Sequence, residues 1–468
     1  MYAGIDIGTG SIKIAWDCGG KITIDKKPYP PDVISGTIHR SYPFIDHMRG
    51  IFSHLQKESR EAGEPIRGIA LDSHGPSLLL MTEGGKSISD IYTWQDNRAL
   101  PIADEFKSSG IGTGKKELGY ETKAAWLYRS YKNRISPKVS KIFSPKDFVV
   151  FLLTGEELTD RASAKTILYY DSEIGSRAAR CAGLPEDLLP RVIEPWETAG
   201  LTGTAFSRSV GLPDGIPVAG GGIDAWCEAL GAGAVNEGDI VEGTGTSTCL
   251  TMCRTRGSGM NYHVVPHMDM DIETLSFTGG SLLWALDLLK EERSFFDEID
   301  LSQPSSLLFL PYLVGERSPV WDPDASGVCV GLRNTTKGEE FLRGVVQGVS
   351  FSIRENLELL SQRSVNTHTA VRAVGGANSS SPWIQQKATI TGRVYHKMSV
   401  LDSAPFGAWL LAAFGGGEGS FEDMSNKYNG VTEVFYPPES TDEYLEQLYA
   451  QYKTLYETLC PVMHSLRE

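Results

Sequence analysis

The sequence predicts a mixed α/β protein built from two lobes of similar design. Its 468 residues exceed what one ordinary hydrophobic core needs and suit two or three domains. Short runs with strand-like alternation are interleaved with longer helical patterns. A Gly-Thr-Ser turn between two strand patterns occurs once in each half of the chain. We therefore expect an N-terminal lobe over residues 1–235 and a C-terminal lobe over residues 236–468.

Composition narrows the class of protein. The hydrophobic fraction of 41% and the charged fraction of 22% are ordinary for a soluble globular protein. The formal net charge of −15 disfavours nucleic acid or an anionic membrane as a partner. The N-terminus has no signal-peptide pattern, and no apolar run is long enough to span a bilayer. The seven cysteines are scattered without a CxxC pair, which favours reduced thiols in a cytoplasm.

The first lobe begins with a predicted β-meander and continues with alternating helices and strands. The predicted strands cover residues 2–7, 12–16, 21–24, 66–71 and 77–81. The predicted helices cover residues 45–62, 97–108 and 122–133. The second lobe opens on two further predicted strands, 239–242 and 248–252, which flank the second Gly-Thr-Ser turn.

The first turn carries groups that suit a phosphate and a metal ion. Its glycines, Gly10 among them, expose backbone N–H groups, and Thr9 and Ser11 add hydroxyl donors. Lys13 offers a cation, and the carboxylate of Asp6 is a hard oxygen ligand for Mg²⁺. A dinucleotide-binding GxGxxG loop would need a third glycine and a following helix, and the sequence has neither. An ordinary hairpin remains the structural alternative.

The second turn, residues 243–247, has the same character and the same alternative. Two such turns, one from each lobe, would hold both ends of a triphosphate. A search for a Walker A loop finds only a near miss, with Ser109 in place of glycine and Lys116 in place of Ser or Thr. We discount that segment.

Two further glycine-rich segments lead into predicted helices. In residues 219–233, glycines precede Asp224, which either caps the following helix or serves as a general base for a hydroxyl. In residues 371–383, a strand runs into Gly375 and Gly376 and then a helix, which suits an adenosine or phosphate contact or a plain turn. His263 and His267 would bind one metal ion only from a helix, which Pro266 opposes.

These segments, in this order, resemble the FGGY carbohydrate kinases, which share the wider sugar kinase, heat-shock ATPase and actin fold. The most specific match is residues 308–327, LFLPYLVGERSPVWDP followed by DASG. The resemblance covers essentially the whole chain. Other matches are DIGTGSIK at 6–13, WQDNR at 94–98, PKD at 145–147, LTG at 153–155, Thr159-Asp160, GGGID at 220–224, GTGTS at 243–247, GGA at 375–377 and the GA-rich stretch 406–413.

The resemblance implies two RNase H-like lobes with mixed sheets flanked by helices, and a cleft between them that holds ATP, Mg²⁺ and a small sugar or polyol. Asp6 would organise Mg²⁺, and Asp224 would take the proton from the attacking hydroxyl. The residues implied to contact the nucleotide are Thr9, Gly10, Ser11, Lys13, Gly245, Thr246, Gly279, Gly375, Gly376 and Ser380.

The implied sugar contacts are His74, Trp94, Asp96 and Asp224, and a pentulose such as xylulose is the expected substrate. Asp72 and Ser73 depart from the Gln-Met that xylulokinases carry before the histidine. Ala225 stands where that group has Asn or Gln, which leaves the sugar open. The Arg-Glu pair of glycerol kinases is absent. There are two alternatives. The acceptor is another polyol, a ketohexose or a sugar acid, or the protein is an ATP-binding regulator of the same fold. A homodimer is compatible with the resemblance.

Overall fold

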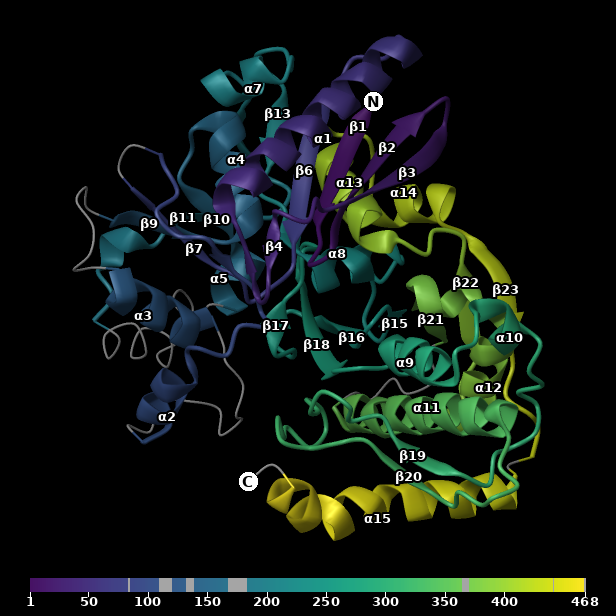
Figure 1. Cartoon of the computed structure of the whole chain (residues 1–468). Coiled ribbons are helices and arrows are strands. Elements are labelled where there is room, and N and C mark those ends of the chain that lie inside the picture. Colours follow the sequence, from purple (N-terminus) through teal and green to yellow (C-terminus); the bar gives the residue numbers. More distant parts are fainter. Residues whose placement is uncertain are drawn as a thin grey trace. The chain divides into compact units, whose positions relative to one another are not determined.

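A computed structural model describes residues 1–82, 85–108, 120–131, 139–166, 183–363, 370–440 and 442–466 (Figure 1). The Walker A-like segment and the end of the predicted helix 122–133 lie outside these residues. The chain forms two compact units. Unit 1 contains Met1–Gly233, Asn261–Met268 and Ser403–Tyr428. Unit 2 contains Ala234–Met260, Asp269–Asp402 and Asn429–Glu468. Two segments from the second half of the sequence therefore belong to the first unit.

The main sheet of unit 1 has the strand order β12-β13-β6-β1-β2-β3, and β14 also pairs with β6. The predicted meander is confirmed, because β1, β2 and β3 pair in antiparallel fashion. In contrast, β6 runs parallel to β1, β13 and β14. The strands are β1 Tyr2–Ile7, β2 Ser11–Cys18, β3 Lys21–Pro28, β6 Gly68–Ser73, β12 Thr198–Leu201, β13 Pro217–Ala219 and β14 Gly222–Ile223.

Helices cover both faces of this sheet. Ile5 and Ile7 share a hydrophobic core with Phe44 and Phe52 of α1 (Ser41–Ala62), which runs along β1 and β6 in Figure 1. On the other face, a side chain at Gly4 would lie 2.1 Å from the carbonyl oxygen of Pro405. The backbone of α13 (Ser403–Gly415) can therefore lie directly on β1 only because residue 4 has no Cβ.

Glycines also bring α13 against α8 (Asp224–Gly231), the helix that begins with the predicted base. A Cβ on Gly407 would lie 1.9 Å from the carbonyl oxygen of Cys227, and one on Gly231 would lie 2.0 Å from that of Ser403. The two helix backbones are thus in contact, and the GA-rich stretch 406–413 is explained by this packing.

Smaller sheets and helices complete unit 1. The three-stranded sheet has the order β4-β5-β8, and the two-stranded sheets pair β7 with β9 and β10 with β11. These strands are β4 Ile34–Ser35, β5 Ile38–His39, β7 Leu79–Thr82, β8 Ile91–Tyr92, β9 Val139–Phe143, β10 Leu158–Asp160 and β11 Arg191–Ile193, with β17 at Asn261–Tyr262. The helices are α2 Leu100–Ser108, α3 Tyr120–Tyr131, α4 Pro145–Thr154, α5 Arg161–Thr166, α7 Ala205–Ser209, α14 Phe421–Tyr428 and the short η1 Glu186–Leu188.

The mixed sheet of unit 2 includes the strand order β18-β16-β15-β21-β22-β23. Its antiparallel pair β15–β16 flanks the second Gly-Thr-Ser turn as predicted, and β21 runs parallel to β15 and β22. The strands are β15 Ile240–Thr244, β16 Thr248–Thr255, β18 Met268–Leu275, β21 Val371–Val374, β22 Tyr395–Met398 and β23 Val431–Phe435. The helices are α9 Gly279–Leu289, α10 Arg293–Asp297, α11 Gly338–Gln362, α12 Ser381–Thr391, α15 Glu443–Ser465 and the short η2 Gly376–Ser379.

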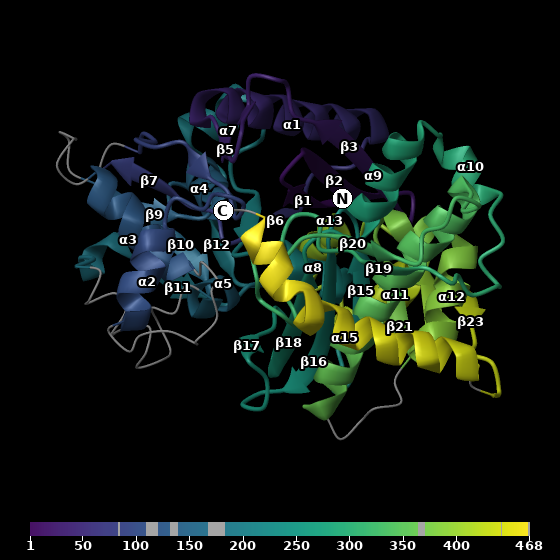
Figure 2. The same ribbon diagram turned by 60° about the horizontal axis from the view of Figure 1, so that its bottom comes forward.

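The family-like block 308–327 forms one side of a hairpin held between two helices of unit 2. Its strand β19 (Leu308–Leu310) pairs with β20 (Val328–Val330) and contacts both α11 and α15, as Figures 1 and 2 show. Leu310 and Tyr312 share a buried cluster with Tyr449 and Tyr452 of α15. The most recognisable part of the sequence is therefore a docking surface for the last helix.

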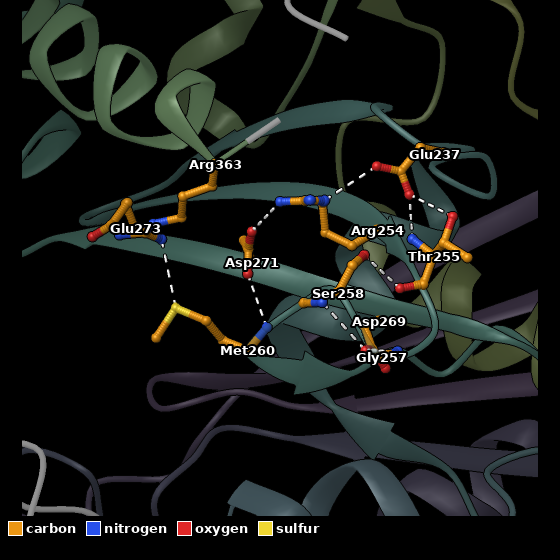
Figure 3. Close-up of polar contacts among 11 residues, drawn as sticks. Glu237, Arg254, Thr255, Gly257, Ser258, Met260, Asp269, Asp271, Glu273 and Arg363 are labelled. Carbon is orange, nitrogen blue, oxygen red and sulfur yellow. Dashed lines mark hydrogen bonds and ion pairs between the residues drawn. The ribbon is translucent and has the colours of Figure 1, made fainter. Parts of the chain in front are cut away.

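Strand β18 carries buried acids on alternate residues, which place them on one face of the strand. Asp271 pairs with Arg254 at 2.9 Å, and Arg254 also reaches Glu237 at 3.1 Å (Figure 3). Glu273 pairs closely with Arg363 in the same view. Buried carboxylates without such partners would be strongly destabilising, so these pairs favour the observed position of β18.

Two observations concern the cysteines and the bilayer. The six cysteines that the structure describes are free thiols, and Cys181 lies outside those residues. Among the helices described, none is long and apolar enough to cross a membrane.

Candidate functional site

The sequence-predicted carboxylates of unit 1 gather at one edge of its sheet. Strands β1, β6 and β14 run parallel, so their carboxyl ends lie at the same edge, where ligands bind in open α/β sheets. Asp6 of β1 is opposite Asp72 of β6, and Asp72 is opposite Gly222 of β14. Asp224 follows two residues after Gly222, and His74 follows two residues after Asp72.

The carboxyl groups of this edge influence one another directly. Burial raises the pKa of Asp72 well above its usual range, and the charges of Asp6 and Asp224 raise it further. Lys13 opposes the shift, and its ammonium lies 3.7 Å from the Asp6 carboxylate. Asp72 is completely buried and lies in strand register with Asp6. The sequence alone assigns no role to Asp72, because this residue departs from the family pattern. Its position opposite Asp6 follows from the strand register.

The glycines before Asp224 explain how it reaches this edge. A Cβ on Gly221, which has φ +76°, would lie 1.9 Å from the carbonyl oxygen of Leu71 in β6. Asp224 is the first residue of α8, and its Oδ1 accepts a hydrogen bond from the N–H of Ala225 at 2.8 Å. The helix cap is Ile223, which has no capping side chain. The alternative interpretation, in which Asp224 is only the cap residue, is therefore wrong by one position.

A buried lysine anchors the same glycine run. The ammonium of Lys146 donates to the carbonyl of Gly220 at 3.1 Å. It also contacts the carboxylates of Asp147 at 2.5 Å and Asp160 at 2.8 Å. All three side chains are at most 2% exposed. Burial opposes the charge on Lys146, but the two carboxylates raise its pKa above the usual value. The PKD and Thr-Asp family matches thus hold the turn that delivers Asp224.

The first turn is tied to the loop that carries Trp94. The N–H of Gly8 donates to Ser11 at 3.0 Å and closes the turn. The indole N–H of Trp94 donates to the hydroxyl of Thr9 at 3.0 Å. Gly10 is exposed at the tip, and a Cβ there would meet nothing within 4 Å. The tip therefore presents open backbone, which is what a phosphate needs.

His74 is buried at this edge as a neutral imidazole. Its burial, reinforced by His39 and Lys123, holds its pKa well below the usual range. Nδ1 lies 2.6 Å from the hydroxyl of Ser77, and Nε2 has no hydrogen-bond partner within the parts of the chain that are described. A buried polar atom left in this state is unusual, and a ligand hydroxyl would satisfy it.

Asp96 is engaged inside the protein. Its carboxylate accepts from Thr37 at 2.8 Å and from the N–H of Arg98 at 3.1 Å. The buried Lys123 donates to the carbonyls of Thr93 and Asp96. Burial lowers the pKa of Lys123 to about 8. These bonds fix the loop that carries Trp94. Asp96 and Lys123 therefore stabilise the conformation of this loop.

In unit 2, the second turn lies beside the start of α9. The carbonyl of Thr246 accepts from the N–H groups of Thr278 at 2.9 Å and Gly280 at 3.0 Å. A Cβ on Gly279 would lie 2.2 Å from the carbonyl oxygen of Gly245. Gly245 and Thr246 themselves are exposed. The structure therefore brings together Gly245, Thr246 and Gly279, as the resemblance implies.

The loop after β21 joins the same group. Gly375 has φ +88°, and a Cβ there would lie 2.4 Å from the carbonyl oxygen of Thr244. Below it, the buried Lys387 contacts the carboxylate of Glu242 and the side-chain oxygen of Asn378 at 2.8 Å. Gly376 has open space around its Cα. Each unit thus contains a buried lysine that pairs with a buried carboxylate, and in unit 1 this lysine also bonds to the glycine run.

Ser380 lies in a pocket of about 430 Å³ whose other lining residues are Arg293, Phe296, Asp297, Leu301, Ser379, Ser381 and Pro382. A second pocket of about 830 Å³, on unit 1 near Tyr2 and Gln56, contains none of the predicted site residues. The pocket at Ser380 is the better candidate for a nucleotide, because Ser379 and Ser380 follow the Gly375–Gly376 segment.

The donor set of unit 1 fits a magnesium ion. Mg²⁺ prefers hard oxygen ligands from one or two carboxylates and water. Asp6 and Asp224 supply carboxylate oxygens at one edge, and the buried carboxyl group of Asp72 lies in register with Asp6.

Comparison with known proteins agrees with this geometry. The N-terminal domain of the FGGY family of carbohydrate kinases matches residues 1–231, and the C-terminal domain of that family matches residues 243–416. The chain therefore belongs to the FGGY family of carbohydrate kinases and is a phosphotransferase of that class.

Individual relatives span nearly the whole chain. The xylulose kinase of Bacillus subtilis is 25% identical over 480 residues, which cover 97% of this chain and 96% of the relative. The gluconokinase of the same species is 26% identical over 467 residues, with 90% and 89% covered. A solved xylulose kinase from Lactobacillus acidophilus has a TM-score of 0.86 at 22% identity, with 98% of each chain covered, and confirms the predicted fold.

Proposed function

We propose that this protein transfers the γ-phosphoryl group of ATP to a hydroxyl of a pentulose, with xylulose as the first substrate to test. The observation that supports this best is the gathering of Asp6, His74 and Asp224 at one sheet edge. Full-length similarity to xylulose kinases supports the choice of sugar.

Asp224 is proposed as the general base. Its position at the start of α8 places its carboxylate by helical N–H groups, which favour the anionic form. In the reaction, the sugar hydroxyl oxygen forms a bond to the γ-phosphorus, the bond to the bridging oxygen breaks, and ADP leaves. Asp224 accepts the hydroxyl proton. Removing such a base costs about 10²-fold or more in kcat.

The other residues have supporting roles. Asp6 would hold Mg²⁺, which neutralises developing charge on the phosphates when bound. Thr9, Ser11 and Lys13 would bind phosphate oxygens from unit 1. From unit 2, the exposed turn at Gly245 and Thr246 would bind the phosphates. The pocket beside Ser380 would take the adenine ring.

The acceptor is proposed to be neutral. The three carboxyl groups of Asp6, Asp72 and Asp224 lie at the sugar-side edge. Asp72 stands where xylulokinases carry an amide. The charges of Asp6 and Asp224, which also act on Asp72, would repel an anionic acceptor such as gluconate. The orphan Nε2 of His74 instead suits a sugar hydroxyl, and Trp94 offers an apolar ring to a C–H face.

Free cysteines agree with a reducing cytoplasm as the site of action.

The test is ADP release with Mg-ATP over a panel of xylulose, ribulose, fructose, glycerol and gluconate. We expect the highest kcat/KM for a pentulose. Asp224→Ala should bind ATP normally and lose sugar-dependent ADP release, whereas Asp214→Ala, an exposed control in the same unit, should retain it. ATP binding without any sugar-dependent release in the wild type would instead indicate a regulator.

A further inference from the structure

A cluster of three different metal-binding side chains lies far along unit 2, among residues to which the proposed function gives no role. It joins Asp322, in the WDP part of the family-like block, to Cys460 and His464 of α15. The ligand atoms of these three residues all lie within 4.8 Å of one another.

Two elements preorganise the cluster. Tyr456, Cys460 and His464 are spaced by four residues, which places them on one face of α15. Opposite them, the loop is fixed by paired backbone hydrogen bonds between Glu316 and Asp322, at 2.8 and 2.9 Å. The Asp322 side chain is 5% exposed and that of His464 is 43% exposed, so a dissolved ion has access from the histidine side.

The contacts converge on a common point. The Nε2 atom of His464 lies 2.6 Å from Oδ2 of Asp322 and 3.7 Å from Sγ of Cys460. Sγ lies 4.0 Å from the same Asp322 oxygen. In tetrahedral zinc sites, the metal–ligand distances of about 2.0–2.3 Å give ligand–ligand separations of about 3.3–3.6 Å. Two of the three separations here are within a few tenths of an ångström of that range, and the third needs the hydrogen bond to open.

A nucleophilic Cys-His-Asp triad explains this geometry poorly. A triad uses one imidazole nitrogen for the thiol and the other for the carboxylate. Here the same nitrogen, Nε2 of His464, faces both groups. A single nitrogen that faces a thiol and a carboxylate is what a shared metal ion requires.

A simple His464–Asp322 ion pair is the remaining alternative. It accounts for the 2.6 Å contact but does not explain why the Cys460 thiol lies close to both groups. Among the ion pairs recorded in the described part of the chain, none joins Asp322 to a lysine or arginine, so no fixed cation competes for its carboxylate. The hydroxyl of Tyr456, 2.8 Å from Oδ2 of Asp322, or a water molecule would complete four ligands.

We propose that Asp322, Cys460 and His464 bind a borderline-soft divalent cation, with Zn²⁺ as the first choice, and that the ion ties α15 to the 316–324 loop. A thiolate and an imidazole favour Zn²⁺ or Co²⁺ over Mg²⁺. The site is thus chemically separate from the magnesium site proposed in unit 1.

The test uses the full chain, freed of metal by a chelator, with Co²⁺ as the spectroscopic probe. One equivalent of Co²⁺ should give a thiolate-to-cobalt charge-transfer band that Zn²⁺ abolishes and millimolar Mg²⁺ leaves unchanged. Cys460→Ser and His464→Gln should lose the band. Cys329→Ser, a half-buried cysteine of the same unit, should keep it.

The result must also appear as ligand-linked stability. Zn²⁺ should raise the Tm of the wild type, because a ligand that binds only the folded state stabilises it. The rise should vanish in both site variants, and both should retain sugar-dependent ADP release as evidence of folding. A missing cobalt band in the wild type, or an undiminished band in Cys460→Ser, would overturn the proposal.

Discussion

His74 illustrates how much one buried atom can indicate. A histidine after a strand is often only a satisfied core residue, and the sequence cannot exclude that. The structure shows one ring nitrogen bonded to Ser77 and the other without a partner in the described chain. Since its pKa is held well below the usual range, the ring stays neutral and can donate or accept a hydrogen bond.

We predict that His74→Leu raises KM for the sugar by about three- to tenfold, the cost of one neutral hydrogen bond, and leaves KM for ATP unchanged. Steady-state kinetics with each substrate varied in turn measures this. His54→Leu is the matched control, because it changes a partly exposed histidine of α1 to which the proposed site gives no role. An equal rise in both KM values would assign His74 a structural role.

Glu316 supplies a pH-dependent prediction from the family-like block. Burial raises its pKa to about 7, although the N–H groups of Ser276 and Arg317 oppose the shift. The folded state therefore holds a proton that the unfolded state releases near pH 4.5. Stability should fall as the pH rises from that value to about 7, by up to about 3 kcal/mol.

Glu316→Gln removes this titration. We expect its Tm to exceed that of the wild type by a margin that grows between pH 5 and pH 8, as thermal melts at each pH would show. Glu298→Gln, at an exposed position, should show a constant margin. A Glu316→Gln margin that shrinks with rising pH would contradict the assigned direction.

At the scale of elements, each unit contains a buried lysine that pairs with a buried carboxylate. Lys146 holds the Gly220 carbonyl, and Lys387 holds Glu242 and Asn378 below Gly375. Such lysines look like surface residues in a sequence. Their burial follows from partners that are distant in the chain, so local patterns miss them.

Lys146→Met should leave Asp147 and Asp160 buried without a counter-charge. We expect a loss of about 3–5 kcal/mol in the free energy of unfolding, because removal of one partner strands the other charges. Urea unfolding measures it. Lys141→Met, on the nearby strand β9, should cost far less, since Lys141 is more exposed and pairs with a partly exposed Glu157 at 3.6 Å.

Helix contact through glycine gives a second prediction at this scale. Gly407→Ala would place a methyl group 1.9 Å from the Cys227 carbonyl oxygen, so it should cost about 1–3 kcal/mol or more. Gly50→Ala, on the exposed face of α1 with nothing within 4 Å, should instead stabilise by about 0.5–1 kcal/mol. Chemical denaturation of both variants checks the opposite signs.

At the scale of the whole molecule, the residues proposed for the sugar lie in unit 1, and those for the adenine ring and part of the phosphates lie in unit 2. Substrate affinities should therefore be separable by mutation. Thr246→Val should weaken ATP binding by about tenfold or more, the scale of a hydrogen bond to a charged group, and leave sugar affinity unchanged.

Calorimetric titration with a non-hydrolysable ATP analogue and, separately, with the sugar measures both affinities. Asp224→Asn serves as the control variant. It should retain the affinities for ATP and for the sugar while losing turnover. A parallel loss of sugar affinity in Thr246→Val would show that the unit 2 turn does more than bind the nucleotide.

The sequence by itself determined the meander, the two glycine turns, the start of α8 near Asp224 and the family. Those features rest on local periodicity, on turn chemistry and on a contiguous block of residues, all of which are written in consecutive letters. The tertiary structure alone decided that Asp72 lies beside Asp6, that Lys146 is an anchor, that segments 261–268 and 403–428 belong to unit 1, and that Cys460 and His464 meet Asp322. These facts depend on strand register and helix docking between residues up to hundreds of positions apart, where burial and charge pairing select the partners.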